Sequence, residues 1–469
     1  MTVLETVVRL VYLGAATSFV VGLHLMSSPI TARRGNQVSA AGMTAAVAAT
    51  LALLIDSRAV TATGWLVLAA GATVGALAGL YGARTVQMTA MPQLVSLFNA
   101  VGGGAAALVA VHEFAGSPAD LPTRVAVPTA LDVLIGAVTL SGSLLASGKL
   151  QGIVPGRPII FRGLRAANLA LAAVALAAGG LLAAGRGGAA AMVVLALAAL
   201  AFGVTMVLPI GGADMPVVIS LLNACTGTAV AMAGLVVDNS VLVIAGAIVG
   251  AAGGILTKLM ADAMNRSLTA IVVGGFGTGD DAVGPAPGDA GAAVRRITAD
   301  DAAIQLAYAS KVVIVPGYGL AAAQAQHAAY ELARLLEDRG VEVTYAIHPV
   351  AGRMPGHMNV LLAEANVPYP QLVDMDEANR DFPRTDVALV VGANDVTNPA
   401  ARRPGNAVSG MPILDVDRAR NVIVIKRSMG HGYAGIDNEL YTDPRTGMFF
   451  ADAKAGLTEL CNAVTALVG

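Results

Sequence analysis

The chain has 469 residues, of which 56% are hydrophobic and only 13% are charged. A soluble globular protein carries about a quarter charged residues, so this composition excludes an ordinary soluble enzyme. The formal net charge of −2 lacks the basic excess that nucleic-acid binding needs, and we expect no nucleic-acid partner. Cys225 lies in an apolar run and Cys461 in the last predicted helix, so neither a disulfide nor a metal site is expected.

The apolar residues are concentrated before about residue 263, and the rest of the chain has the composition of a soluble domain. Each apolar run has close to the ~20 residues that a helix needs to cross the hydrocarbon core. Residues 1–270 are therefore predicted to form a membrane all-α helical bundle of about nine transmembrane helices. The predicted spans are 6–26, 38–55, 61–82, 90–112, 126–147, 165–184, 189–208, 214–236 and 240–263.

The charges in the loops predict the orientation of this bundle. Cytoplasmic loops carry an excess of Lys and Arg. With the N-terminus outside, the inner loops hold Arg33, Arg34, Arg84, Lys149, Arg157, Arg162, Arg165 and Arg266, and the outer loops hold only Arg58, Arg124 and Arg186. Nine spans then place the C-terminal domain in the cytoplasm.

An internal repeat marks the membrane part. Residues 91–100 and 215–224 share Met-Pro, Ser-Leu and Asn-Ala in register, which aligns Ser96 and Asn99 with Ser220 and Asn223. A polar side chain within a span is expensive and indicates function, but it can equally hold two helices together by hydrogen bonding. Both interpretations stay open.

Other polar groups in or beside the predicted spans are further candidates. His24 is the only histidine inside a span, so it can serve as a proton relay or lie near the interface as a satisfied polar group. Asp214 precedes the helix of the second repeat and can simply cap it. The remaining candidates are Asp132, Ser141, Ser143 and Lys258.

Residues 271–297 are rich in Gly, Pro and Asp and are predicted to form a flexible linker to a domain of residues 298–469, which begins with a helix N-cap at Thr298. Strands and helices alternate in this domain, which predicts a cytoplasmic α/β, Rossmann-like, doubly wound parallel sheet. The predicted strands are 312–316, 342–347, 372–374, 387–391, 413–415 and 422–426, and the predicted helices are 320–338, 357–365 and 453–467.

The first strand of this domain ends in a glycine turn. Gly317, Gly319 and Ala322 have the spacing G-x-G-x-x-A between an apolar strand and an Ala-rich helix. Glycines in such a turn let backbone N–H groups at a helix N-terminus approach a pyrophosphate. The alternative is a strand–helix turn that needs glycine only for its shape.

The second strand lacks the acidic residue that usually holds a ribose 2′-hydroxyl, because its only carboxylate, Glu342, lies at the opposite end. The strand 422–426 instead delivers Lys426, Arg427 and Ser428 at its end. Two cations and a hydroxyl suit a 2′-phosphate, which favours NADP(H) over NAD(H). The alternative is a solvated basic strand end.

Three further loops have residues suited to a nucleotide. The loop 348–357 contains Arg353, which can contact a phosphate. The loop 391–399 follows a buried strand, where ligands bind in doubly wound folds, and offers Asn394, Asp395 and Asn398. The segment 430–435 is predicted to form a lid that places Tyr433 over the nucleotide.

Long motifs in both parts of the chain closely resemble the β subunit of proton-translocating NAD(P) transhydrogenase. They include GYGLAAAQAQ at 317–326, HPVAGR at 348–353, PGHMNVLLAEA at 355–365, GAND at 392–395 and KRSM at 426–429. Residues 211–216, 264–267 and 274–277 extend the resemblance to the membrane part. It therefore covers essentially the whole chain.

The resemblance implies that the soluble domain binds NADP(H), reversed relative to ordinary Rossmann domains, and that the membrane domain conducts protons. Hydride would pass to or from NAD(H) on a separate α subunit, in a dimer of αβ units in the bacterial inner membrane. The implied cofactor-binding residues are Gly317, Tyr318, Gly319, Ala322, Val350, Ala351, Gly352, Arg353, Gly392, Ala393, Asn394, Asp395, Lys426, Arg427, Ser428, Gly432, Tyr433 and Ala434.

The resemblance also assigns roles in coupling. It implies that Asp395 links protonation to NADP(H) affinity, and it implicates Asn223, Ser143, Asp214 and Arg266 on the membrane side. Some family members have a proton-relaying histidine at the position of Asn99, which cannot titrate, so the relay is expected elsewhere, for instance at His24 or on the partner. The alternative function is a transporter or channel gated by a cytoplasmic dinucleotide-sensing domain.

Overall fold

A computed structural model describes residues 3–26, 29–87, 90–116, 122–155, 159–210, 215–263, 294–352, 356–404, 406, 408–432 and 434–467. These residues fall into two compact units. One comprises Met1–Pro209 with Val218–Thr257 and is helical. The other comprises Ile210–Val217 with Lys258–Gly469 and contains the sheet.

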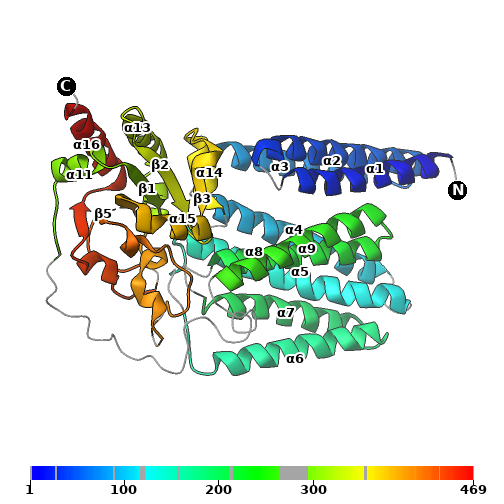
Figure 1. The fold of residues 1–469 in the computed structure, drawn as a ribbon. Coiled ribbons are helices and arrows are strands. Elements are labelled where there is room, and N and C mark those ends of the chain that lie inside the picture. The colour runs from blue at the N-terminus through cyan, green and yellow to red at the C-terminus, as the bar shows by residue number, and fades with distance from the viewer. Residues whose placement is uncertain are drawn as a thin grey trace. The chain divides into compact units, whose positions relative to one another are not determined.

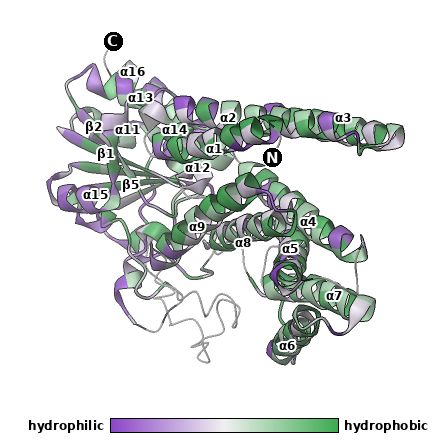
Figure 2. Cartoon of the chain, turned by 90° about the vertical axis from the view of Figure 1, so that its right-hand side faces the viewer, coloured by the Kyte–Doolittle hydropathy of each residue, from purple (hydrophilic) through white to green (hydrophobic). Residues whose placement is uncertain are grey.

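Among the described residues, nine helices are long and apolar enough to cross a membrane, as the sequence predicts. They are α1 (Val3–Leu25), α2 (Pro29–Ser57), α3 (Ala62–Thr85), α4 (Met91–Gly116), α5 (Thr123–Leu150), α6 (Leu164–Ala183), α7 (Gly188–Val207), α8 (Met215–Val236) and α9 (Ser240–Ala263). Figure 2 shows hydrophobic residues along most of their length. The chain is therefore a multi-pass membrane protein.

The helix α2 differs most from its predicted span. The sequence predicts 38–55, the shortest of the spans, but α2 runs Pro29–Ser57 and is the longest of the nine. The hydropathy pattern leaves the polar stretch before residue 38, which contains Arg33 and Arg34, out of the predicted span. Arg33, Arg34 and Gln37 are nevertheless good helix formers, and the proline at the start occupies the helix end where it is tolerated.

Small residues bring the helices of the membrane unit into close contact. A Cβ added at Gly136 of α5 would lie 2.4 Å from the carbonyl oxygen of Gly103 on α4, and one at Gly103 would lie 2.8 Å from Cβ of Thr139. Between α8 and α9, a Cβ at Gly227 would lie 2.3 Å from the backbone nitrogen of Gly250. Close backbone approach of this kind drives helix association in lipid.

The second unit contains a six-stranded parallel sheet of order β3-β2-β1-β4-β5-β6, which confirms the predicted doubly wound fold (Figure 1). Its strands are β1 (Lys311–Pro316), β2 (Glu342–Ile347), β3 (Leu372–Asp374), β4 (Val387–Val391), β5 (Asn421–Lys426) and β6 (Thr446–Phe450). The order of connection reverses between β1 and β4. Ligands bind at such a switch point, beyond the carboxyl ends of the strands.

Both faces of this sheet are buried, which explains why its strands are continuous apolar runs. Val313 and Val315 of β1 pack with Phe382 and Tyr441 on one face. On the other face the Tyr345 hydroxyl donates to the carbonyl of Ala329 at 3.3 Å. The helices and turns around the sheet are α11 (Ala299–Ala307), α12 (Tyr318–Ala322), α13 (Gln326–Glu337), α14 (His357–Glu364), η2 (Tyr369–Gln371), α15 (Met375–Asp381), η3 (Phe382–Arg384), η4 (Asp395–Thr397), η5 (Pro399–Arg402), η6 (Val416–Arg418), η7 (Glu439–Thr442) and α16 (Ala453–Ala466).

The single helix predicted at 320–338 is wrong, because the chain forms α12 and α13 with a break between them. Gln324 has φ +50 at the break, and Ala325 N–H donates to the Leu320 carbonyl at 3.0 Å. Left-handed backbone at a non-glycine residue ends a helix but is not visible in an Ala- and Gln-rich sequence.

The strand predicted at 413–415 is also wrong, and β6 takes the edge position instead. Side chains satisfy the backbone of 412–415: His348 Nε2 lies 2.8 Å from the Pro412 oxygen, and the Asn379 amide donates to the Ile413 oxygen and accepts from Asp415 N–H. β6 was missed because Gly447 interrupts its pattern. A Cβ there would lie 2.7 Å from Ile297, so the glycine makes room for that side chain.

The start of the second unit agrees with the predicted N-cap. The Thr298 hydroxyl accepts from Asp301 N–H, and the Asp301 carboxylate accepts from Thr298 N–H, which makes a complete capping box for α11. Just before it, Arg296 forms a parallel bridge with Met448 of β6. The end of the predicted linker thus pairs with the sheet, and residues 271–293 lie outside the described residues.

Candidate functional site

The turns that follow β1 and β4 interlock at the switch point of the sheet. Gly317 N–H donates to the Val391 carbonyl at 2.9 Å, and Gly319 N–H donates to the Gly392 carbonyl at 2.9 Å. A Cβ at Gly317 would lie 2.3 Å from Cα of Ala393, and one at Gly392, which has φ +67, would lie 2.4 Å from Cα of Gly319. These glycines are therefore required for close backbone packing at the edge where a ligand is expected.

The turn after β2 is built on a buried histidine. His348 is 1% exposed, its Nδ1 accepts from Val350 N–H at 3.2 Å, and its carbonyl accepts from Ala351 N–H at 3.0 Å. Burial lowers the pKa of His348 to about 4, opposed by its bond to the Pro412 carbonyl, so the ring is neutral. Gly352 ends the turn with φ +108. The histidine thus shapes the loop that the sequence analysis assigned to a nucleotide.

Lys426 and Arg427 have different surroundings. Lys426 Nζ lies 4.6 Å from the centroid of the Tyr441 ring and donates to the Gly430 carbonyl. Burial lowers the pKa of Lys426, while the charges of Asp395 and Asp437 oppose the shift. Arg427 and Ser428 are exposed. The predicted pair of cations therefore consists of one held inward and one at the surface.

The described residues of the segment 430–434, which are 430–432 and 434, fold back toward the ends of β4 and β5. Ala434 N–H donates to Asp395 Oδ2 at 3.0 Å, and a Cβ at Gly432 would lie 2.3 Å from Asp395 Oδ1. With its amide oriented to suit its neighbours, Asn394 accepts from Gly432 N–H at 2.6 Å and from Lys426 Nζ at 3.3 Å. The segment expected to be a lid is thus anchored on Asn394 and Asp395.

Two residues that the sequence analysis missed support this arrangement from below. The Tyr441 hydroxyl donates to the Ala393 carbonyl at 3.2 Å, and the Asn438 amide donates to the Asn394 carbonyl at 3.0 Å. Burial raises the pKa of Tyr441, so its hydroxyl stays neutral. Both residues lie more than 40 positions beyond the loop they hold. The only signal in the sequence is that an amide and an aromatic residue follow the Gly-rich segment 430–435, and this does not indicate which loop they contact.

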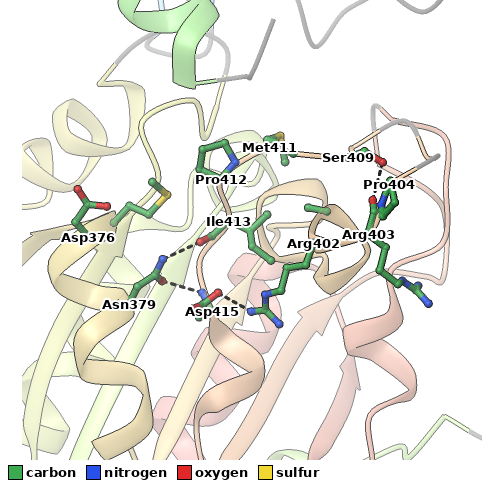
Figure 3. A pocket seen from close by; sticks show the side chains of 13 residues that line it. Asp376, Asn379, Arg402, Arg403, Pro404, Ser409, Met411, Pro412, Ile413 and Asp415 are labelled. Carbon is green, nitrogen blue, oxygen red and sulfur yellow. Dashed lines mark hydrogen bonds and ion pairs between the residues drawn. The ribbon is translucent and has the colours of Figure 1, made fainter. Parts of the chain in front are cut away.

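A pocket of about 730 Å³ lies beside these loops and is lined by none of the predicted cofactor residues. α15, η5 and the segment 409–415 form its walls (Figure 3). Arg402 donates to Asp415 at 2.5 Å and to Asp417 at 2.6 Å, which fixes its guanidinium on one wall. Asn379 of α15 binds the backbone of Ile413 and Asp415 in the same segment that Arg402 contacts, as Figure 3 shows.

In the membrane unit the repeated polar residues connect helices. The Asn99 amide donates to the Ile219 carbonyl of α8 at 3.3 Å, and the Thr226 hydroxyl donates to the Asn99 carbonyl at 3.2 Å. Ser96 donates to the Ser143 carbonyl at 2.8 Å. These bonds agree with a role in joining helices, and a coupling role for Asn99 stays a prediction.

The other predicted membrane residues have varied positions. Ser143 is fully buried, Asn223 is half-buried on α8, and His24 is exposed in the last turn of α1. This position at the end of α1 agrees with a histidine near the membrane interface. A role for His24 in a proton relay stays a prediction. The predicted residues Asp214, Arg266, Arg353 and Tyr433 lie outside the described residues.

Together, the nine apolar helices and the doubly wound sheet with interlocked glycine turns define a multi-pass membrane protein that carries a Rossmann-type domain. The family model for the NAD(P) transhydrogenase beta subunit matches residues 8–463. An NAD(P) transhydrogenase subunit beta from Rhodospirillum rubrum is 46% identical over 486 residues, covering 97% of this chain and 98% of the relative. A second sequence, from a named strain of that species, gives the same values.

The chain belongs to the NAD(P) transhydrogenase β-subunit family. The family resemblance found in the sequence motifs is thereby confirmed. The family implies that NAD(H) and NADP(H) take part in its reaction, and the word subunit in its name implies an α-subunit partner.

Proposed function

We propose that this chain binds NADP(H) at the carboxyl edge of its sheet and exchanges hydride with NAD(H) held on an α subunit. The reaction is reversible and coupled to proton translocation through the helical unit. The observation that carries the proposal is the interlocking of the turns at Gly317, Gly319 and Gly392 at the switch point. A Cβ at any of these positions would collide with backbone, and such turns admit a dinucleotide backbone to peptide N–H groups.

The residues at the end of β5 fit the cofactor with a 2′-phosphate. Glu342, the only carboxylate of β2, pairs with Lys311 at 2.9 Å at the opposite edge of the sheet, so no β2 carboxylate is available for a ribose hydroxyl. At the carboxyl end of β5, Lys426 and Arg427 supply two cations instead. Arg427 is exposed and has no ion pair among the described residues. When bound, NADP(H) supplies the nicotinamide ring that accepts or donates the hydride.

Asp395 is positioned to connect protonation with the closure of the lid. As a carboxylate it accepts from Ala434 N–H at 3.0 Å, and Gly432 packs directly against it. Protonation of the carboxylate weakens this charge-assisted bond and releases the segment 430–434. The affinity for NADP(H) then differs between the two protonation states, which is what coupling to a proton gradient requires.

The assembly completes the proposal. The chain lies in the bacterial inner membrane with its N-terminus outside and its sheet domain in the cytoplasm, as the loop charges predict. It works as part of a dimer of αβ units. Direct transfer between two nicotinamides requires the rings to be held in contact, with no flavin or metal between them.

The test is isothermal titration of the purified full-length chain with NADPH and NADH. We expect NADPH to bind much more tightly, and the double variant Lys426→Ala/Arg427→Ala to lose on the order of 100-fold, from about 1.5 kcal/mol for each charge-assisted contact. The matched control is Arg334→Ala/Arg384→Ala, which removes two exposed cations just before the starts of β2 and β4, at the opposite edge of the sheet. Preference for NADH, or equal losses in both double variants, would refute the assignment of the 2′-phosphate.

A further inference from the structure

Asp132 is a fully buried carboxylic side chain in the middle part of α5. It has no exposed surface, and neither carboxyl oxygen has a hydrogen-bond partner among the described residues. It lies about 14 Å along the helix from the first residue of α5, at a rise of ~1.5 Å per residue. A carboxylate without a partner at such a depth costs several kcal/mol or more, so the group is protonated and neutral at rest.

The other buried charged side chain among the described residues of α1–α9 is Lys149, and it is fully accounted for. Its ammonium donates to the carbonyls of Val207 at 3.3 Å and Leu208 at 2.5 Å at the end of α7. A cation at a helix C-terminus is a structural arrangement. Asp132 has no comparable arrangement, and a structural role therefore does not explain it.

Among the described residues, the helices that pack against α5 provide no counter-charge for Asp132. The helices that pack on α5 are α4, α6, α7 and α8. α7 carries no titratable residue, α8 carries only Cys225, and α6 carries only Arg165 in its first turn. On α4, His112 and Glu113 are exposed. On α5 itself, Arg124 and Lys149 lie near the two ends.

A line of buried polar groups leads away from Asp132 along α5. The polar residues are Thr139 and Ser143, which lie with Gly136 on the face of Asp132, at successive spacings of four, three and four residues. This face packs against α4: a Cβ at Gly136 would meet the Gly103 carbonyl at 2.4 Å. The Ser143 hydroxyl is buried and has no partner among the described residues, and its carbonyl accepts from Ser96.

The polar residues Thr139 and Ser143 continue into Ser96 and Asn99 of α4, and we call these four residues the seam. Thr139 Oγ1 donates to its own helix at Ile135, which leaves its oxygen able to accept another bond. Beyond it lie Ser143, Ser96 and Asn99, whose amide donates across to α8. A water molecule needs two to four polar partners to be stable inside a protein, and the seam offers such groups in sequence.

We propose that Asp132 is a proton-carrying residue of the membrane unit, exchanging its proton through the seam of Thr139, Ser143, Ser96 and Asn99. This inference rests on the proposed coupling of hydride transfer to proton translocation. In the step, the O–H bond of the carboxylic acid breaks, the proton passes to a water molecule in the seam, and the carboxylate is left. A proton arriving from the other side of the membrane then restores the acid.

The experiment uses the full chain with its α subunit in liposomes that enclose a pH-sensitive dye. Asp132→Asn has nearly the same shape and stays neutral, so it preserves packing but cannot release a proton. We expect proton translocation to fall on the order of 100-fold in Asp132→Asn, the contribution typical of a positioned proton-transfer group. Asp132→Glu keeps a carboxyl group and is expected to retain most of the translocation.

Two further measurements separate this role from a structural one. Binding of NADPH and the thermal unfolding midpoint in detergent should be unchanged in Asp132→Asn. Infrared spectroscopy of the wild type should show the carbonyl stretch of a protonated carboxylic acid, which disappears in Asp132→Asn without any turnover.

Each outcome bears on the inference. Undiminished translocation by Asp132→Asn, or equal losses in the Asn and Glu variants, would overturn the role of Asp132 and leave the proposed function standing. Absence of proton translocation by the wild type would overturn the proposed function, and this inference with it.

Discussion

Gly432 packs so closely against Asp395 that adding a single methyl group at residue 432 tests whether this contact holds the segment 430–434 in place. The change is Gly432→Ala. The added Cβ would lie 2.3 Å from Oδ1 and 2.7 Å from Oδ2 of Asp395, whereas non-bonded atoms of this kind need more than 3 Å. Either the carboxylate turns away or the segment 430–434 moves off the ends of β4 and β5.

The cost follows from the bonds that such a movement breaks. Ala434 N–H donates to Asp395 Oδ2 at 3.0 Å, and a hydrogen bond to a charged group is worth about 1.5–3 kcal/mol. If the closed segment retains NADP(H), as we propose, its displacement should speed NADPH release on the order of tenfold or more. Stopped-flow fluorescence of bound NADPH, chased with excess NADP⁺, measures that rate directly.

Gly430→Ala is the matched control. It adds the same methyl two residues earlier, where the nearest atom is Ser428 Oγ at 3.5 Å, an ordinary contact. It also restricts the unfolded segment to the same degree, so entropy effects of replacing glycine cancel between the two variants. Equal release rates in the two variants, or a Gly432→Ala rate within twofold of the wild type, would show that the Asp395 contact does not hold the lid.

Two further predictions concern stability. The pKa of His348 is about 4 in the folded protein and ~6.5 in an unfolded chain, so the unfolded chain takes up the proton first as the pH falls. The free energy of unfolding is therefore greatest above about pH 6.5 and falls toward pH 4, with a loss of about 2 kcal/mol at pH 5. His348→Gln should flatten this part of the dependence of the unfolding free energy on pH, measured by denaturant unfolding followed by circular dichroism. In the membrane unit, Gly246→Ala places a Cβ 2.4 Å from the Ala231 nitrogen and should lower the unfolding midpoint in detergent, whereas Gly254→Ala on the same helix meets nothing within 4 Å and should not. Similar midpoints for these two variants would mean that α8 and α9 do not depend on close backbone contact.

The fold was predictable because its determinants are local. Apolar runs of helix-spanning length and short apolar runs between turns each report on their own segment, so the nine long helices and five of the six strands among the described residues were found. Errors arose where a local pattern was interrupted for a distant reason. Gly447 interrupts β6 because Ile297, far away in the sequence, packs against it.

The candidate site was predictable only in part, for the same physical reason. Glycines and polar residues at the ends of β1, β4 and β5 follow strands that the sequence already showed, so their meeting at one edge follows from the parallel fold. Tyr441 and Asn438 are different. They reach the loop at Ala393 and Asn394 from η7 and the residue before it, and nothing near them in sequence indicates which loop they hold.

The segment 412–415 shows how side chains can replace a strand partner. It is extended and apolar enough to resemble a strand, but its backbone is satisfied by His348 and Asn379 rather than by a neighbouring strand. Because the segment does not add to the sheet, it is free to line the pocket, where Asp415 accepts from Arg402 (Figure 3). The same buried histidine shapes the loop after β2, so the pocket wall and that loop are linked through one imidazole. A change that displaces His348 is therefore expected to disturb both together.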